Sequence, residues 1–264
     1  MTTAPAPAAA DTPSPYVEVT PRYLAGPGEA RYVIGPLSAV GWRNVSAPHS
    51  PVIRLITPDG RVRLTVDPDP DQWFWRIHAQ AVAGSGEASW EVTFSARVPA
   101  EILAGFTNAL ILPEPAIQAR PLAPLAAGGW TVDDLGSHWA LSPDHAVSLT
   151  HATVDDSTRP WFAQTSVPRG NGFDEVWAAR FGEHTPHYLI TAFTTALADT
   201  APLVRHRSRT PPMARSALVT RPSDVTADSI REQLASRERA ARTIRRTRLP
   251  RSPAVPDPKP GRRR

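Results

Sequence analysis

The sequence repeats itself once, at a spacing of 85 to 88 residues, and this repeat limits the folds open to the chain. Its clearest form is a Trp-x3-Phe-x4-Pro-x6-Phe-x3-Leu pattern, which runs from Trp90 to Leu110 and again from Trp177 to Leu197. Gly-Trp and Pro-Asp pairs recur ahead of both copies at matching distances. Solenoid proteins use shorter and more numerous units, so two copies at this period indicate two homologous modules.

Each copy predicts a short helix followed by a β-hairpin. The short helices cover residues 36–40 and 124–128 and end before Gly-Trp. In the first module two apolar-rich runs flank Thr57-Pro58-Asp59-Gly60, and the second run alternates polar and apolar residues as a half-buried strand does. Pro and Gly favour a tight turn there, because Pro fixes φ and Gly accepts a positive φ. His145 takes the place of this Gly in the second module, so we expect the second turn to depend less on a left-handed residue.

Two more strands and a closing helix complete each predicted module. The strands cover residues 73–82 and 89–96 in the first module, and 161–167 and 175–182 in the second. Pro99 or Pro186 then opens a helix at its first position, where the missing N–H is no loss. We expect each module to bury its Trp–Phe pair against its own closing helix. Four mainly antiparallel strands under a helix make the predicted fold α+β.

The repeated motifs resemble those of the SPDY domain, a streptomycete-type domain of unknown function named after a Ser-Pro-Asp-Tyr turn. The matching elements are Pro21–Gly28, Gly41-Trp42, Asp67-Pro68-Asp69, the Trp/Phe pattern and Ser142-Pro143-Asp144. The resemblance covers roughly residues 17–203 and implies two tandem copies of the domain. Neither turn ends in Tyr here, since Gly60 and His145 occupy that place. The resemblance implies no activity, substrate or catalytic residue.

Charge divides the chain into an acidic body and a basic tail. Residues 1–204 carry 12 Arg and 20 acidic residues, a net charge of −8, whereas residues 205–264 carry 17 basic and 5 acidic residues, a net charge of +12. Such asymmetry is expected of proteins that bind nucleic acid or associate with themselves. Arg outnumbers Lys 28 to one over the whole chain, so the choice of Arg does not by itself indicate phosphate recognition.

Composition also sets the predicted domain boundaries. Thirty prolines, against a usual share of about 5%, place part of the chain in linkers and tails. We assign residues 1–16 to a disordered end, 17–113 to the first module, 114–119 to a linker, 120–203 to the second module and 204–264 to an Arg-rich tail whose end, 251–264, is also disordered.

The tail is expected to hold one helix over about residues 224–249, which contain no Pro or Gly. Upstream of it, Pro211-Pro212 and Arg221-Pro222 are expected to prevent regular structure. A narrow apolar stripe follows one side of the helix and is interrupted by Arg237. Its members are Ile230, Leu234, Ala241 and Ile244.

Motifs for catalysis or metal binding are absent or weak. The sequence has no cysteine, phosphate-binding loop, dinucleotide fingerprint or Gly-x-Ser-x-Gly elbow. Three acidic groups lack the spacing of calcium loops and are interpreted as turns: Asp67 to Asp71, Asp133-Asp134 and Asp155-Asp156. Four histidines of the second module could surround a zinc ion, but the first module lacks them, so we expect surface histidines and no cofactor. They are His145, His151, His184 and His187.

The sequence favours a non-enzymatic binding protein of the cytoplasm. No apolar run reaches the ~18 residues of a membrane span, and the first residues lack the features of a secretory signal. The two modules would recognise a protein partner or assemble with themselves, and the tail would bind DNA or RNA without sequence specificity. The candidate phosphate-binding residues are Arg205, Arg207, Arg209, Arg237, Arg239, Arg242, Arg245, Arg246 and Arg248.

Two other functions stay open. An enzyme or metal-binding protein would place its site at the cleft between the modules, around the four histidines. A structural interaction protein would fold the basic tail onto its own acidic body. The Trp–Phe stripes could also stack bases, but their alternation beside a helical stripe favours the core, which leaves Trp75 and Trp139 as the expected exposed tryptophans.

Overall fold

The computed structural model describes residues 14–69, 74–81, 84, 86–117, 119–153 and 158–248. Most of both predicted disordered ends lies outside this part of the chain, as do Asp71, Trp73 and the Asp155-Asp156 pair. The described residues form helices and two sheets, which confirms the α+β class.

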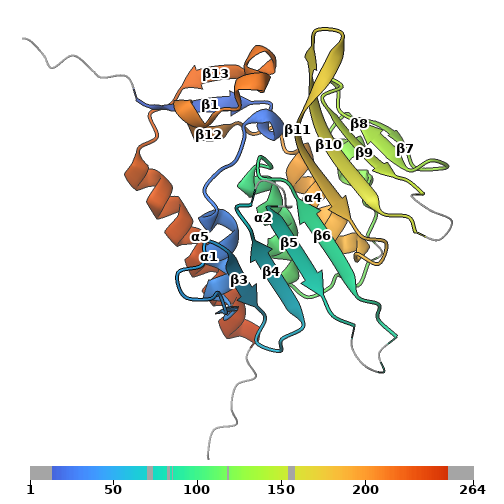
Figure 1. Cartoon of the computed structure of the whole chain (residues 1–264), viewed down its shortest axis with the longest axis vertical. Helices are drawn as coiled ribbons and strands as arrows, with labels where there is room; N and C mark the ends of the chain where they lie inside the picture. Colours follow the sequence, from blue (N-terminus) through green and yellow to red (C-terminus); the bar gives the residue numbers. More distant parts are fainter. Residues whose placement is uncertain are drawn as a thin grey trace, which may run out of the picture.

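Five strands from each module join edge to edge in one ten-stranded antiparallel sheet (Figure 1). The first module supplies β2 (Arg43–Asn44), β3 (Ile53–Ile56), β4 (Val62–Val66), β5 (Trp75–Ala79) and β6 (Trp90–Phe94). The second supplies β7 (Thr131–Asp133), β8 (Trp139–Leu141), β9 (Val147–His151), β10 (Trp161–Arg169) and β11 (Gly172–Phe181). Four strands per module are predicted, and the fifth, β2 or β7, is an edge strand too short to show an alternating pattern.

The sheet is continuous because β6 pairs with β11 on a pseudo-twofold axis. In this pairing Thr93 lies opposite Arg180, and Phe94 and Val92 lie opposite Ala179 and Phe181. Thr93 and Arg180 occupy the same place in the two copies of the repeat. The strand order β2-β3-β4-β5-β6-β11-β10-β9-β8-β7 therefore reads the same from both edges of the sheet.

Two closing helices, α2 (Ala100–Leu110) and α4 (His187–Ala198), pack against each other across the same axis. A Cβ on Gly105 would lie 2.5 Å from the Cβ of Ala196 and 2.9 Å from the carbonyl oxygen of Ala192. Ala192 is the counterpart of Gly105 in the repeat, so the helices cross where the symmetry axis passes. Gly105 is required here because the backbones approach too closely for a side chain.

Each Trp–Phe pair packs against its own closing helix, as expected: the ring centroid of Phe94 lies 5.9 Å from that of Phe106, and Phe181 lies 5.0 Å from Phe193. The cores of the two modules are also joined, which the sequence does not predict. Phe94 of the first module lies with its ring centroid 5.8 Å from that of Phe193, and Phe106 lies 5.9 Å from Phe181. All four rings are fully buried. Trp75 is also buried and Trp139 half-buried, so the two tryptophans outside the repeat are not the exposed ones.

Both predicted hairpin turns form, and they have the same geometry. The Gly60 N–H donates to the Thr57 carbonyl over 2.9 Å, and the His145 N–H donates to the Ser142 carbonyl over the same distance. Gly60 has a φ of +80° and His145 a φ of +62°. The expectation that the second turn depends less on a left-handed residue is therefore wrong: His145 adopts that conformation, which His tolerates better than most residues.

The start of the described chain pairs with two strands from residues 203–222 in a second, three-stranded sheet of order β12-β1-β13 (Figure 1). Its strands are β1 (Tyr16–Thr20), β12 (Leu203–His206) and β13 (Val219–Pro222). The sheet lies across the predicted boundaries of module and tail, and β13 forms in spite of Pro222, which occupies its last residue. The short 3-10 turn η1 (Arg22–Leu24) follows β1, and two more, η2 (Arg207–Arg209) and η3 (Pro212–Ala217), lie between β12 and β13.

The remaining helices are α1 (Arg31–Ala39), α3 (Ala123–Ala127) and α5 (Ala227–Arg248). The helix α1 starts five residues before the predicted helical turn and packs along α5. The helix α5 confirms a single helix in the tail, at slightly narrower bounds than the pattern predicts.

Phe106→Ala should lower the free energy of unfolding by about 3–5 kcal/mol, because it opens a cavity in a cluster that both modules share. We expect one urea transition, with coincident curves from far-UV circular dichroism and Trp fluorescence. Phe173→Ala, at a side chain that is 75% exposed, is the control and should change little. Two separate transitions, or a loss below ~1 kcal/mol, would contradict the shared core.

His145→Gly should raise the free energy of unfolding by up to about 1 kcal/mol, because the left-handed conformation costs a residue with a Cβ about 1–2 kcal/mol. Part of this gain is lost, because Gly gives the unfolded chain more conformational entropy. Gly60→Ala should lower it by about 1 kcal/mol. Nothing lies within 4 Å of a Cβ at Gly60, so this cost is conformational. Urea titration measures both, and changes of the same sign would refute the strain at His145.

Candidate nucleic-acid interface

The helix α5 is fixed to the body by its apolar stripe. Leu234 and Ala241 are buried, and Ile230 and Ile244 are half-buried, on the side that packs against α1. The interruption at Arg237 has a partner: its guanidinium lies 5.2 Å from the centroid of the Tyr32 ring. A cation over an aromatic face is stabilised by the ring's quadrupole. Arg237 therefore also makes a favourable contact with the body, although it is charged.

Two polar contacts set how α5 lies on α1. The Tyr32 hydroxyl donates to Oε1 of Gln233 over 2.8 Å, and Nε of Arg31 donates to Oε1 of Glu238 over 2.7 Å. Burial, and then the charge of Glu101, raise the pKa of Tyr32, so its phenol keeps the proton it donates. A Cβ on Gly35 would lie 2.6 Å from the Glu238 carboxylate, so Gly lets the two helices approach.

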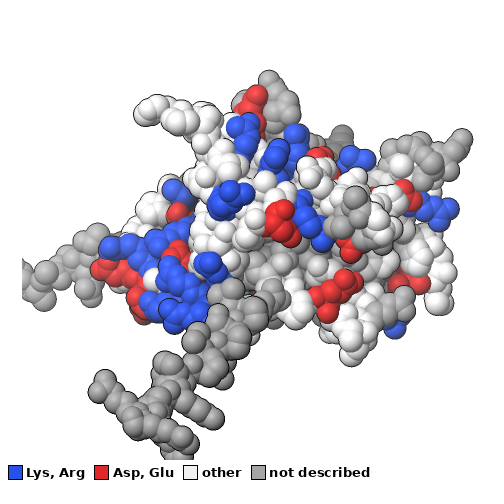
Figure 2. All heavy atoms as spheres, turned by 90° about the horizontal axis from the view of Figure 1, so that it is seen from below, with Lys and Arg blue, Asp and Glu red and all other residues white. Residues whose placement is uncertain are grey.

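The outer side of α5 carries the strongest concentration of positive charge, which we call the arginine face. It consists of the exposed Arg239, Arg242, Arg245 and Arg246. Residues 239–248 include five Arg and no acidic residue. Glu232 pairs with Arg239 and Glu238 with Arg242, whereas Arg245 and Arg246 form no ion pair with any described residue. Figure 2 shows basic side chains gathered on one side of the molecule, with a few acidic ones among them.

A groove runs between α1 and the arginine face. Its volume is about 710 Å³. From α1 it is lined by Arg31, Ile34, Gly35, Ser38 and Ala39, and from α5 by Glu238, Arg242, Arg245 and Arg246. Guanidinium groups from both helices line the groove, which suits an anionic ligand.

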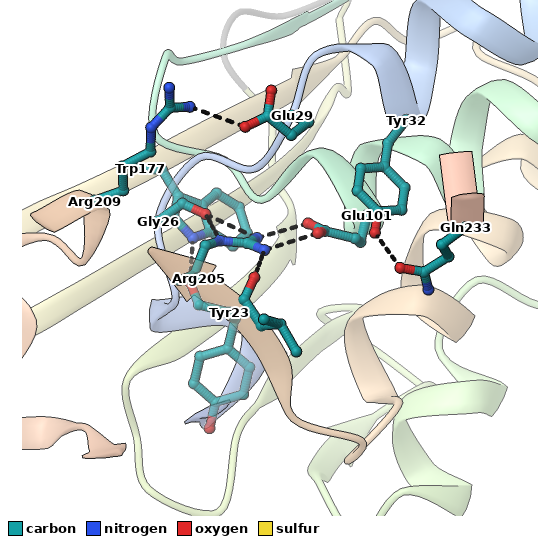
Figure 3. Close-up of polar contacts among 10 residues, drawn as sticks. Tyr23, Gly26, Glu29, Tyr32, Glu101, Trp177, Arg205, Arg209 and Gln233 are labelled. Carbon is teal, nitrogen blue, oxygen red and sulfur yellow. Dashed lines mark hydrogen bonds and ion pairs between the residues drawn. The ribbon is translucent and has the colours of Figure 1, made fainter. Parts of the chain in front are cut away.

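Arg205, one of the candidate phosphate-binding residues, is instead buried in an internal ion pair (Figure 3). Its Nη1 and Nη2 donate to the two carboxylate oxygens of Glu101 over 2.7 and 2.6 Å, and further bonds reach the carbonyls of Gly26 and Val204. Because its donors are taken up inside the protein, Arg205 holds β12 to α2 and to the opening segment of the first module. We leave it out of the interface.

The other predicted arginines are not all brought together. Arg207 and Arg209 are exposed in η2, and Arg209 pairs with Glu29 over 3.3 Å. This turn lies near the start of α5, where Arg209 and Ile230 line one pocket, so it is separated from the arginine face by the length of the helix. Arg248 ends α5, and its side chain lies outside the described part. Arg31, which sequence reasoning missed, joins the face from α1; no local pattern signals it.

The histidines of the second module do not form a metal centre. Within the described residues, no three His, Asp or Glu side chains lie close enough together to hold an ion. His151 stacks on Trp161 with ring centroids 4.6 Å apart, and burial lowers its pKa. The junction between the modules, where an enzyme site was one alternative, is occupied by the β6–β11 pair and the four phenylalanines.

The acidic groups that the structure describes lie in turns, as the sequence predicts. The Asp67 carboxylate accepts from the Asp69 N–H over 3.1 Å. Asp133 accepts from the N–H groups of Leu135, Gly136 and Ser137, and these bonds lower the pKa of Asp133. These carboxylates therefore close their own turns through backbone N–H groups, as Asp does in Asx turns.

Two segments of the chain, residues 56–116 and 141–203, match the family model SPDY, a domain of unknown function (DUF317). These two segments are therefore two tandem copies of the SPDY domain. No curated protein and no solved structure matches it. Neither matching segment includes α5, so the arginine face lies outside both copies. No helix of the described residues has the length and apolar character to cross a membrane.

Glu101→Ala should lower the free energy of unfolding by about 3–5 kcal/mol, because it leaves the Arg205 charge buried and unpaired. The control, Asp134→Ala, breaks the exposed pair with Arg120 and should cost less than about 1 kcal/mol. The double variant Glu101→Met/Arg205→Met should recover most of the loss. Equal losses for Glu101→Ala and Asp134→Ala in urea titrations would show that the buried pair does not stabilise the fold.

Proposed function

We propose that this chain is a non-enzymatic binding protein with two binding surfaces. The double SPDY body would recognise a protein partner or a second copy, and the arginine face would bind DNA or RNA without sequence specificity. The observation that carries the nucleic-acid part is the cluster of exposed arginines on a helix that is held rigidly to the body. No catalytic residue and no cofactor are assigned in this proposal.

Electrostatics supports a phosphate-binding role for this face. Arg245 and Arg246 have no acidic partner among the described residues, so binding a phosphate breaks no existing ion pair at these positions. Charge-assisted hydrogen bonds from guanidinium to phosphate are short and strong. Because α5 is already packed on α1, little conformational entropy is lost on binding. Contacts to phosphates carry no sequence information, so unrelated sequences should bind alike.

A second function is favoured by the contacts of Glu238. This carboxylate contacts both Arg31 and Arg242, and α5 buries its apolar stripe on the body. In this alternative α5 braces α1, and its remaining arginines keep the helix soluble and favour its C-terminal end through the helix dipole. The two functions differ in one measurable property, the affinity of the whole chain for nucleic acid.

Binding to short duplexes of two unrelated sequences, followed by fluorescence anisotropy over a range of salt concentrations, tests the proposal. We expect log affinity to fall linearly with log salt. The variant Arg242→Gln/Arg245→Gln/Arg246→Gln should flatten the slope by roughly three units, equally for both sequences, since each contact adds nearly one unit.

The matched control is Arg207→Gln/Arg209→Gln/Arg231→Gln, which removes the same charge near the start of α5. It should change the slope by less than about one unit. Equal effects of the two triple variants would show a response to net charge alone. Undiminished binding by the first variant would exclude the arginine face and leave the bracing function.

A further inference from the structure

One face of the ten-stranded sheet is left uncovered by the described helices. The helices α2 and α4 cover the other face, through the four shared phenylalanines (Figure 1). Side chains that point away from these helices are exposed on both modules, as Glu91 in β6 and Gln164 in β10 show. We call this side of the sheet the open face.

The register of the strands places one side chain from each of eight strands in a single row across the open face. Residues that lie opposite each other in paired strands point to the same face, so the row follows from the pairing alone. Neighbouring strands are about 4.8 Å apart, which makes the row roughly 34 Å long. From β3 to β8 it consists of Arg54, Thr65, Arg76, Thr93, Arg180, Phe162, Thr150 and Trp139.

The first part of the row is positively charged and carries no acidic residue, although the body as a whole has a net charge of −8. Arg180 is exposed and Arg54 half-buried, and neither forms an ion pair with any described residue. Nε of Arg76 lies 3.9 Å from the Glu91 carboxylate, and within the described chain it is buried without a hydrogen bond. These arginines are therefore weakly engaged by the protein itself.

Two aromatic rings, Phe162 and Trp139, continue the row into the second module. Both are half-buried, and among the described residues neither belongs to the hydrophobic core or to the partly buried side chains packed on it. The next residue in each strand, Ala163 or Ala140, is buried on the side of the helices, so the rings stand on the open face. Packing of the core therefore does not explain why these positions are aromatic.

The pseudo-twofold axis relates the two parts of the row. Thr93 and Arg180 are counterparts, so their partners Arg76 and Phe162 are counterparts too. By the same pairing, Arg54 corresponds to Trp139 at the far ends of the row. The first module thus presents arginines at the two places where the second presents rings.

Arginines in line with exposed rings suit a single strand of nucleic acid. Unpaired bases stack on aromatic side chains, and guanidinium groups bind phosphates or stack on bases. A protein partner would need apolar side chains at the centre of its interface, whereas threonines separate the rings and arginines of this row. An acidic protein would pair with the arginines and leave the rings without a partner.

We propose that the open face binds single-stranded nucleic acid. Its bases would stack on Phe162 and Trp139, and its phosphates would bind the arginines of the row. This inference goes beyond the proposed function, because it places a second nucleic-acid surface on the body and makes it selective for unpaired bases. The arginine face, which would contact phosphates alone, has no such selectivity.

The probe is an oligothymidylate of about 12 nucleotides, a length within the usual site sizes of single-strand binders, and a duplex of equal length is its control. The full chain should bind the single strand saturably in fluorescence anisotropy. Phe162→Leu and Trp139→Leu should each weaken this binding about 5- to 100-fold, because they remove a stacking platform. Both keep an apolar side chain, so the fold is expected to persist. Phe162→Tyr and Trp139→Phe keep a ring and should bind nearly as the wild type does.

Duplex binding separates this inference from the proposed function. The ring variants should leave it unchanged, because the bases of a duplex are not available for stacking. The arginine-face variant Arg242→Gln/Arg245→Gln/Arg246→Gln provides a second background for the same measurements. In that background the loss caused by Phe162→Leu or Trp139→Leu on the single strand should be of the same size. Either surface can therefore fail its test while the other passes.

Salt dependence separates the arginines of the row from its rings. Arg54→Gln/Arg76→Gln/Arg180→Gln should flatten the slope for the single strand by about two units, since each phosphate contact on a single strand adds about 0.7 unit. Phe162→Leu should lower the affinity and leave the slope unchanged. The matched control, Arg97→Gln/Arg120→Gln/Arg215→Gln, removes three exposed arginines that lie outside the sheet and should change the slope by less than about one unit.

Four results would overturn the proposal. The first is single-strand binding that is absent, or that both Leu variants leave intact, and the second is equal weakening of single strand and duplex by these variants. The third is a wild-type dimer that the Leu variants dissociate, which would assign the face to a second copy. The fourth is competition by polyglutamate as strong as that by an oligonucleotide of equal charge, which would assign the face to an acidic protein.

Discussion

The two repeats are joined by the pairing of β6 with β11, in which Thr93 lies opposite its own counterpart, Arg180. Without this pairing, each module would have an unpaired edge strand. An unpaired edge strand is prone to pair with another chain, so this junction protects both modules at once. It also fixes the distance between α2 and α4 and brings four phenylalanines from both copies into one cluster. Because the register has a twofold centre, each strand of one module has a counterpart in the other. The modules therefore behave as the halves of one domain, and differences between them arise from what the two ends of the chain add.

Local patterns were sufficient to predict the hairpins, the closing helices and the tail helix. Alternation, turn residues and helical spacing are properties of neighbouring residues, and the repeat allowed each prediction to be made twice. The pairing of β6 with β11 and the sheet of β1, β12 and β13 were not predictable, because a strand does not specify its partner in its own pattern. The left-handed turn at His145 was missed because side-chain preference is weaker than the hairpin geometry imposed by the flanking strands.

The sequence was sufficient to predict a positively charged site in the tail, but not which residues form it. A run of arginines signals positive charge, but it does not say which member is buried: Arg205 faces Glu101 inside the protein, and Arg237 covers Tyr32. Conversely, Arg31 lines the groove beside the arginine face although it is far from the tail in sequence. Only the structure shows that Tyr23 lies against Trp130 of the second module.

The central strand of the small sheet comes first in the described chain, and both of its partners follow the whole body, with only α5 after them, and this order has a consequence during synthesis. Tyr16 pairs with His206, and Val17 pairs with Pro222. A ribosome takes on the order of 10–40 s to add the intervening residues. Over that interval the nascent chain holds β1 without its partners, so the opening segment can reach its final place only after translation has passed β13. The body can form earlier, which makes the closure of the two ends a late and separate event in the life of the molecule.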